Sequence, residues 1–403
     1  MKEAETTKIR AWVLISAVVA FCPGCAKWTQ QTFATVDGTA PWRGTGGNTE
    51  TQPPLRPRFG VNIHPLHEPY NAQRVEQLLD AARTLGASLV RIDIPWAWVE
   101  TSKAGKWESK TIARLDSFLA QAAVRDIEVL ATVMASPCWA SADPAKMCTP
   151  GFVHYDQRYP PKEANTYADF LADLVKHYKD HIHYWEVWNE PNLPLVWHQL
   201  DAGTYAALLR AAYPAIKAAD PEAVVLGGAL APWYGSADEV NMLAYLHGIY
   251  DAGAENFFDA LSIHPYTDGH APSWYNPRWP LHSYSRVVPT IRKIMREHGD
   301  HRPIWITEIG WTTVTKCNDC WTPWLPTTEA NQAAYLGQAL MIAQQWDYVD
   351  AVLVYELVDA NTRESPSFDD HFGLLRHDLS LKPSHRAFQD MALPRKAYIS
   401  TTR

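Results

Sequence analysis

Short apolar runs alternate with amphipathic segments along most of this chain. Eight runs of mainly apolar, β-branched and aromatic residues lie at 59–63, 88–93, 127–133, 184–187, 223–226, 260–263, 304–307 and 351–354. Runs of this length and composition are typical of strands that are buried on both faces, as in a parallel sheet. The pattern therefore predicts eight buried strands.

The segments between these runs have the spacing of helices. Apolar residues recur three or four positions apart at Val75, Leu78, Leu79, Ala82 and Leu85. Gly86 follows as a stop signal, and similar patterns lie at 112–119, 167–174 and 287–294. Eight strand–helix units predict an α/β fold of the (β/α)8 TIM barrel type with a single catalytic domain. A doubly wound open sheet is the alternative, but no Gly-rich nucleotide loop follows the first strand.

The composition fits a globular protein that is not built for nucleic acid. The chain has 403 residues, 47% of them hydrophobic, and a net charge of −8. No basic cluster is present, which argues against a nucleic-acid partner. The 18 Trp and 18 Tyr include many in loop-like stretches: Trp233, Tyr234, Trp274, Tyr275, Trp279, Trp321 and Trp324. Flat aromatic faces with a polar edge suit sugar rings.

The N-terminus has the pattern of an export signal. Lys2, Lys8 and Arg10 precede an apolar run at 11–22 that is too short to span a bilayer. We expect a signal peptide at 1–25, a linker at 26–57, the catalytic domain at 58–395 and a C-terminal tail at 396–403. A lipidated Cys25 would tether the protein to a membrane, and cleavage after Ala26 is the alternative. Either route predicts a periplasmic, extracellular or envelope-anchored protein.

Export changes the interpretation of the remaining cysteines. Cys138 and Cys148 flank a short loop, and Cys317 and Cys320 form a Cys-Asn-Asp-Cys pair. In an oxidising compartment, two structural disulfides are the simplest explanation of these pairs. A zinc site with four thiolates is the alternative.

Two glutamates follow apolar runs directly. Glu190 comes just after the run at 184–187, and Glu308 just after the run at 304–307. Barrel enzymes place catalytic residues at the C-terminal ends of their strands, so these carboxyls are expected to face each other across the mouth. Retaining glycosidases need two such groups, about 5–5.5 Å apart. The chemistry requires no metal and no cofactor.

The surrounding motifs resemble those of glycoside hydrolase clan A. Trp188-Asn189-Glu190-Pro191 is similar to the acid/base motif of that clan, and Thr307-Glu308-Ile309-Gly310-Trp311 to its nucleophile motif. Supporting segments are Val90-Arg91-Ile92-Asp93, His264-Pro265-Tyr266, Phe372-Gly373-Leu374-Leu375 and Lys382-Pro383. Within the clan the chain most resembles family 39-like enzymes, including bacterial glycosidases of biofilm exopolysaccharides. The resemblance spans roughly residues 59–391.

The resemblance implies a role for each site residue. Glu190 would be the general acid/base and Glu308 the nucleophile. Asn189 would bind the sugar 2-hydroxyl, Arg91 would keep Glu308 ionised, and Tyr266 would hydrogen-bond Glu308. His264 would line the same subsite, and Trp311 and Tyr355 would form walls against the sugar. Tyr355 replaces the Trp of some clan members, which leaves the details of that subsite open. Glu186 shares the side-chain parity of Glu190, so we expect it to point inward as well.

These inferences predict a retaining endo-β-glycosidase that acts on an extracellular or periplasmic polysaccharide. One alternative is an exo-acting β-glycosidase such as a β-xylosidase. The loops at 267–282 and 312–326 would either close one end of the cleft or form the walls of an open groove. A non-catalytic carbohydrate-binding barrel is the alternative from another functional class.

Overall fold

The computed structural model describes the residues 57–67, 71–144, 159–194, 196–198, 201–232, 241–317, 325–362 and 364–393. These residues all belong to one compact unit, Pro53–Arg403. The predicted signal peptide, Cys25, almost all of the predicted linker and the C-terminal tail lie outside them. Cys148 and Cys320 do so too. The predicted domain boundaries and cysteine pairs therefore stay predictions.

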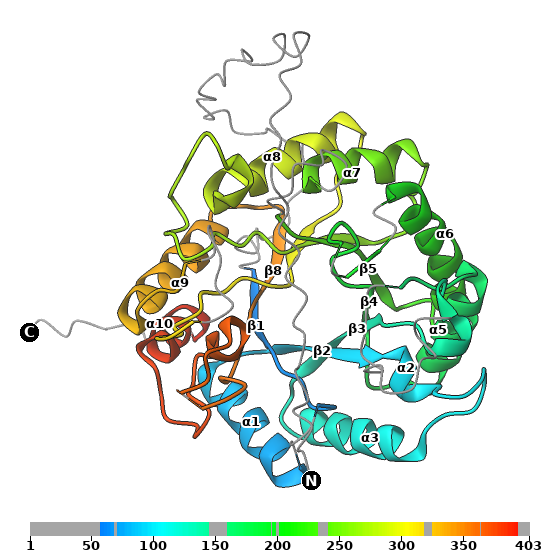
Figure 1. Cartoon of the computed structure of the whole chain (residues 1–403), viewed down its shortest axis with the longest axis horizontal. Helices are drawn as coiled ribbons and strands as arrows, with labels where there is room; N and C mark the ends of the chain where they lie inside the picture. The colour runs from blue at the N-terminus through cyan, green and yellow to red at the C-terminus, as the bar shows by residue number, and fades with distance from the viewer. Residues whose placement is uncertain are drawn as a thin grey trace, which may run out of the picture. The chain divides into compact units, whose positions relative to one another are not determined.

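Eight parallel strands close into a barrel (Figure 1). They are β1 (Arg58–Asn62), β2 (Leu89–Pro95), β3 (Glu128–Met134), β4 (Tyr184–Val187), β5 (Val224–Leu230), β6 (Ala260–Ile263), β7 (Ile304–Ile306) and β8 (Val349–Val354). The ring closes where Phe59 of β1 pairs with Val352 of β8. This pairing confirms the predicted (β/α)8 barrel and excludes the open sheet.

The strands match the eight predicted runs, and the largest difference occurs at β5, with shifts of two residues at the end of β2 and at the start of β8. β5 continues to Leu230 through Gly228 and Ala229, which both have positive φ and lie where its register with β6 shifts. A stretch of small residues carries no periodic apolar signal, so the sequence could not predict this extension. β8 begins at Val349, two residues before the predicted start.

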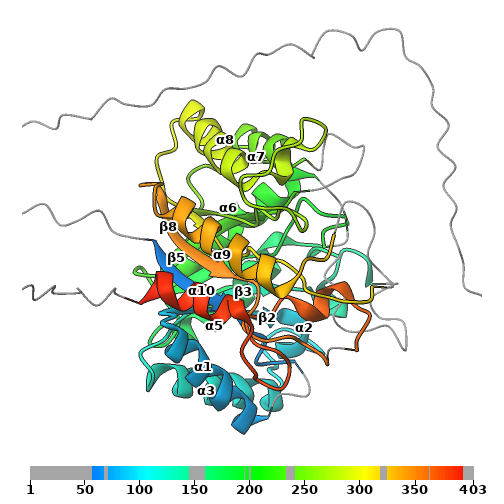
Figure 2. The ribbon, with the colours of Figure 1, turned by 90° about the vertical axis from the view of Figure 1, so that its left-hand side faces the viewer.

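Helices surround the barrel (Figures 1 and 2). They are α1 (Ala72–Leu85), α2 (Trp96–Val99), α3 (Ser109–Ala123), α5 (Ala164–Tyr178), α6 (Ala202–Ala219), α7 (Met242–Asp251), α8 (Tyr284–Glu297), α9 (Glu329–Ala343) and α10 (Pro383–Ala392). Three-residue or four-residue 3-10 helices are η1 (Cys138–Ala140), η3 (Pro280–His282) and η4 (Phe368–His371). α10 packs against both α9 and α1 and so completes the ring.

Helix α1 shows how local sequence sets these boundaries. The Asn71 side chain accepts a hydrogen bond from the Arg74 amide and caps the first turn. Gly86 ends the helix with φ of 86°, a left-handed conformation that favours glycine, and its N–H bonds the carbonyls of Ala82 and Arg83. The apolar face between these caps lies on the barrel.

The barrel interior has two layers of different chemistry. The lower layer is apolar and contains Leu89, Leu130, Leu226, Ala260, Trp305, Ala351 and Leu353. Side chains two positions further along a strand point to the same face. There the interior becomes polar, with Asn62, Arg91, Thr132, Glu186, Ser262 and Thr307, all of them buried. This polar layer lies directly beneath the mouth of the barrel.

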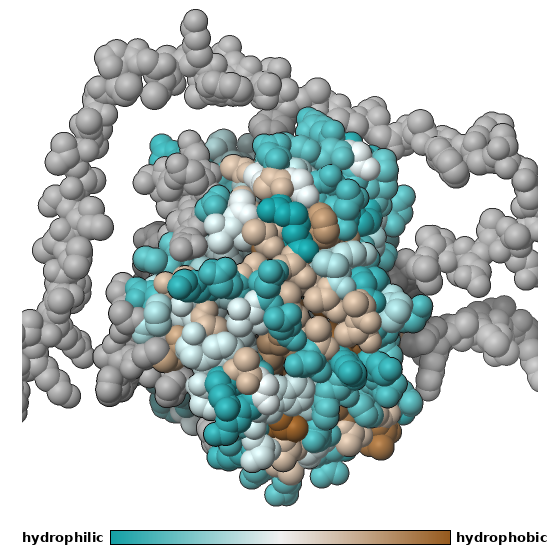
Figure 3. All heavy atoms as spheres, turned by 90° about the vertical axis from the view of Figure 1, so that its right-hand side faces the viewer, coloured by the Kyte–Doolittle hydropathy of each residue, from teal (hydrophilic) through white to brown (hydrophobic). Residues whose placement is uncertain are grey.

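The surface beside α5 and α6 contains both hydrophilic and apolar residues (Figure 3). On the side of α5 and α6 hydrophilic residues predominate, with apolar residues scattered among them (Figure 3). No helix in the part of the chain that the structure describes is long and apolar enough to span a bilayer.

Candidate active site

The backbone turns sharply where β4 ends. Trp188 and Glu190 both have positive φ, 68° and 43° respectively. This conformation is uncommon for non-glycine residues and needs support from the surrounding packing. The buried Trp188 ring supplies that support, because it packs edge-on against Trp197 and Tyr167. The turn brings the Glu190 side chain to the barrel mouth.

Arg91 is the centre of the polar layer. Its guanidinium is only 1% exposed and donates to four side chains. The acceptors are Glu186 Oε2 at 2.8 Å, Glu308 Oε1 at 2.6 Å, Asn62 Oδ1 at 3.0 Å and Asn189 Oδ1 at 2.7 Å. Because the Asn189 oxygen is occupied by Arg91, its amide hydrogens are left to face a ligand. That orientation suits the predicted bond to a sugar hydroxyl.

Glu308 lies at the end of β7 and receives two strong hydrogen bonds. Arg91 Nη1 donates to Oε1, and the Tyr266 hydroxyl donates to Oε2 at 2.7 Å. Burial raises the pKa of Glu308, while the charge of Arg91 and the hydrogen bond from Tyr266 oppose this rise by favouring the carboxylate. The predicted contacts of Arg91 and Tyr266 with Glu308 are therefore both present.

Glu190 has a different environment. Its Oε1 lies 2.9 Å from Nδ1 of His264 and it has no bond from Arg91. Burial raises the pKa of Glu190 to about 7, and the negative charges of Glu186 and Asp93 act in the same direction, against Arg91. A carboxyl that holds its proton near neutral pH is suited to general acid catalysis.

The two glutamates lie close together. One carboxyl oxygen of Glu190, one of Glu308 and a ring nitrogen of His264 are all within 4.8 Å of one another. This separation fits the short spacing of retaining glycosidases, about 5–5.5 Å, and not the wider spacing of about 6.5–9.5 Å in inverting ones. The structure thus brings the predicted pair together at the mouth.

Three buried residues beneath the pair have roles that the motifs did not reveal. Glu186 accepts from the hydroxyls of Thr132 at 2.7 Å and Thr307 at 2.9 Å, and Thr307 Oγ1 lies 3.0 Å from His264 Nε2. The parity of Glu186 predicted that it points inward, as it does. The contacts of Thr132 and Thr307 depend on the register of distant strands, for which the sequence gives no signal.

The two predicted aromatic walls differ in position. Tyr355 is half-buried at the end of β8, where its ring packs against His64 and Phe372. Trp311 is 2% exposed, and its indole N–H donates to Thr267 and to the carbonyl of His270. With its ring covered, Trp311 anchors the loop after β6 and does not present a face to a sugar, contrary to the prediction.

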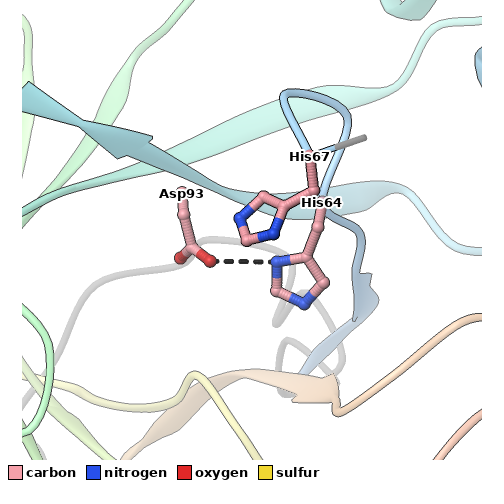
Figure 4. A group of neighbouring side chains, drawn as sticks. All are labelled: His64, His67 and Asp93. Atoms are coloured by element: carbon pink, nitrogen blue, oxygen red, sulfur yellow. Dashed lines mark hydrogen bonds and ion pairs between the residues drawn. The ribbon is translucent and has the colours of Figure 1, made fainter. Parts of the chain in front are cut away.

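A second group of ionisable residues lies beside Tyr355. His64 Nδ1 is 2.9 Å from Asp93 Oδ2, and His67 lies next to it (Figure 4). One atom each of His64, His67 and Asp93 could approach a metal ion together. However, His64 Nε2 also lies 3.4 Å from Glu356 Oε2. Burial alone would lower the pKa of His64, but Asp93 and Glu356 outweigh it and raise the pKa to about 10. In the protonated ring both nitrogens carry hydrogens that face the two carboxylates, so neither nitrogen offers a lone pair to a metal ion.

A closed barrel with two facing carboxyls at the ends of β4 and β7 is the arrangement of glycoside hydrolases of clan A. The comparison of this sequence with known families agrees. The model of the family described as Cellulase (glycosyl hydrolase family 5) matches residues 49–344, and the chain belongs to that family. The predicted resemblance to clan A is thereby confirmed.

The individual relatives include β-xylosidases and an enzyme described as a family 39 glycoside hydrolase. A β-xylosidase of Geobacillus stearothermophilus is 28% identical over 249 residues, which cover 57% of this chain and 46% of that protein. The chain thus spans about half the length of this curated relative. A family 39 glycoside hydrolase from Bacteroides cellulosilyticus WH2 has a TM-score of 0.63 and 25% identity, covering 84% of this chain and 64% of that chain. A monomeric β-xylosidase from Caulobacter crescentus CB15 is 19% identical, with a TM-score of 0.57. The match covers 83% of this chain and 67% of that chain, and it shows a shared fold.

Proposed function

We propose that this protein is a retaining β-glycosidase that cleaves a polysaccharide by double displacement. The observation that carries the proposal is the pair of carboxyls, Glu190 and Glu308, whose oxygens lie within 4.8 Å of each other in opposite environments. Glu308 accepts two hydrogen bonds that favour its ionised form. Glu190 is half-buried, and Arg91 does not contact it.

Each carboxyl has one task in each half of the reaction. In the first half, Glu308 attacks the anomeric carbon while Glu190 gives its proton to the departing glycosidic oxygen, so the C–O bond breaks and a glycosyl ester forms. In the second half, Glu190 takes a proton from water, and the resulting hydroxide displaces Glu308 from the sugar. Both glutamates then regain their starting states. Asn189 would hold the 2-hydroxyl, whose hydrogen bond strengthens in the transition state.

The covalent intermediate provides the direct test. Incubation with 2-fluoro glycosides of several sugars should add the mass of one glycosyl group, and peptide mapping should locate it on Glu308. Glu308→Gln should lose hydrolysis and labelling by a factor on the order of 10⁴ or more, because the nucleophile is gone. The matched control is Glu128→Gln at the opposite end of the barrel, which should keep both. Labelling of another residue, or inversion at the anomeric carbon, would overturn the mechanism.

The pH dependence follows from the general acid. Because the pKa of Glu190 is raised to about 7, kcat/KM should fall as the pH rises through about 7 and Glu190 loses its proton. Glu190→Gln should remove this alkaline limb for substrates with good leaving groups, which need no proton. If the alkaline limb persisted unchanged in Glu190→Gln, the limb would belong to a titrating group other than Glu190.

For the mode of action we propose endo cleavage of a polymer. The loop after β6 carries Trp274 and Tyr275, half-buried, and Trp279, 38% exposed. One face of Trp274 is stacked on His270 and one face of Tyr275 lies under the Arg286 guanidinium, so a sugar ring would have to use the opposite faces of these rings. The relatives named β-xylosidases favour exo action as the second candidate. An early loss of polymer viscosity would support endo cleavage, and release of only monosaccharide would support the exo enzyme.

We further propose that the protein is exported. The basic residues before the apolar run at 11–22 and the two cysteine pairs support this proposal. Mass spectrometry of the mature protein, before and after reduction, should reveal cleavage of the leader, two disulfides and either a lipid on Cys25 or none. An unprocessed N-terminus with reduced cysteines would contradict export.

A further inference from the structure

Beneath the catalytic pair, four side chains form an unbroken line of hydrogen bonds. The line runs from Glu186 Oε1 to Thr307 Oγ1 at 2.9 Å, from Thr307 Oγ1 to His264 Nε2 at 3.0 Å and from His264 Nδ1 to Glu190 Oε1 at 2.9 Å. Glu186, Thr307 and His264 are each at most 1% exposed. Water therefore cannot easily substitute for a missing partner.

The donor and the acceptor of each hydrogen bond follow from the charge of Glu186, the first residue of the line. Arg91 Nε and the Thr132 hydroxyl both donate to Glu186 Oε2, and the pKa of Glu186 is lowered because these donors and the charge of Arg91 outweigh its burial. An ionised carboxylate only accepts, so the single hydroxyl hydrogen of Thr307 must point to Glu186. Thr307 Oγ1 can then only accept from His264, which places a hydrogen on Nε2.

This arrangement determines the form of His264. Burial lowers the pKa of His264, so the ring is neutral and carries one hydrogen, already assigned to Nε2. Nδ1 is left with a lone pair that points at Glu190. A lone pair can only accept, and Glu190 must therefore be the donor and hold its proton.

We propose that Thr307 and Glu186 are positioning residues that fix the hydrogen of His264 on Nε2 and thereby keep the proton of the general acid on Glu190. The inference rests on the proposed function for the role of Glu190, but the line of hydrogen bonds is independent of it. If the ring hydrogen moved to Nδ1, it would donate to Glu190 and stabilise the ionised form, which cannot protonate a leaving group.

Thr307→Val tests the line because valine matches the shape of threonine but lacks the hydroxyl. His264 is then free to carry its hydrogen on Nδ1, and the alkaline limb of kcat/KM should move to lower pH by about one unit. The charged and titratable groups around Glu190 and His264 stay in place: Arg91 and Asp93 from β2, Glu186 from β4, Tyr266 from the segment after β6 and Glu308 from the segment after β7.

Two further variants separate positioning from stability. Thr307→Ser keeps the hydroxyl and should restore the original limb. Thr132→Val is the matched control, since it also removes one hydroxyl from Glu186 but does not touch His264. It should leave the limb within a few tenths of a unit. An unshifted limb in Thr307→Val, or an equal shift in Thr132→Val, would overturn the proposal.

The ring hydrogen can also be located without any substrate. Side-chain ¹⁵N spectra of histidine-labelled protein, with His264→Gln to assign the signals, should show His264 protonated on Nε2 alone. In Thr307→Val the signal should move toward a mixture of the two forms. Protonation on Nδ1 in the unaltered protein would overturn the inference. If no glycoside is cleaved but the Nε2 form is found, the proposed function fails while the positioning role is supported.

Discussion

The two ends of the barrel each contain an arginine paired with a glutamate, but the surroundings of the pairs differ. At the lower end, where the strands begin, Arg58 is 2.6 Å from Glu128, and their side chains are 31% and 42% exposed. Arg58 also lies over the rings of Tyr184 and Trp305. At the upper end Arg91 is 1% exposed and contacts Glu186 and Glu308. An arginine–glutamate pair thus covers the barrel interior at one end, and at the other end it holds the side chains of the candidate site in place.

The two ion pairs differ because water reaches the lower pair, whereas the apolar layer and the surrounding side chains exclude water from the upper pair. An exposed ion pair adds little to stability because water solvates both charges almost as well. A buried charge must be matched in the protein, since its desolvation costs several kcal/mol. The apolar layer separates these environments, so that each end should respond to substitution in its own way.

Replacement of Arg91 by methionine should have the largest effect. Glu186 and Glu308 would lose their common cation, so the free energy of unfolding should fall by about 3–5 kcal/mol. Activity should fall on the order of a hundredfold to a thousandfold, because Glu308 loses a donor that favours its ionised form. Urea unfolding and kcat/KM measure the two effects. Unchanged stability would mean that the upper pair is as well solvated as the lower one.

Leu130→Ala should come next, because it removes volume from the apolar layer between the two ends. The expected loss in the free energy of unfolding is about 2–5 kcal/mol. The pH limbs of kcat/KM should remain where they are, since no polar contact of the site is removed. A shifted limb would show that the two layers are coupled and not separate.

Arg58→Met should have the smallest effect and is the matched control for the first substitution. Its ion pair with Glu128 is partly solvated, and the methionine can still pack on Tyr184 and Trp305. We expect a change of at most about 1 kcal/mol in the free energy of unfolding and no change in kcat/KM. A loss as large as that of Arg91→Met would contradict the comparison of the two ends.

The sequence predicted the barrel well because its signal is local. Each strand coincides with an apolar run in the sequence, and Glu190 and Glu308 directly follow two of these runs. The spacing of apolar residues is therefore enough to predict the strands and to place both glutamates at strand ends. Contacts across the barrel are not local. The hydrogen bond from Thr307 to Glu186, the ion pair of His64 with Glu356 and the covered ring of Trp311 depend on strand register and loop path. These features follow only from the three-dimensional arrangement.

The charged centre also has a consequence for how the chain folds. Arg91 is 95 residues from Glu186 and 217 from Glu308 along the sequence. Until the last strands join the first, these groups remain hydrated on separate parts of the chain, and the desolvation of one cannot be offset by the others. Formation of the centre is therefore coupled to the latest step of assembly. During refolding, catalytic activity should return only with ring closure, after most of the helical signal has already recovered.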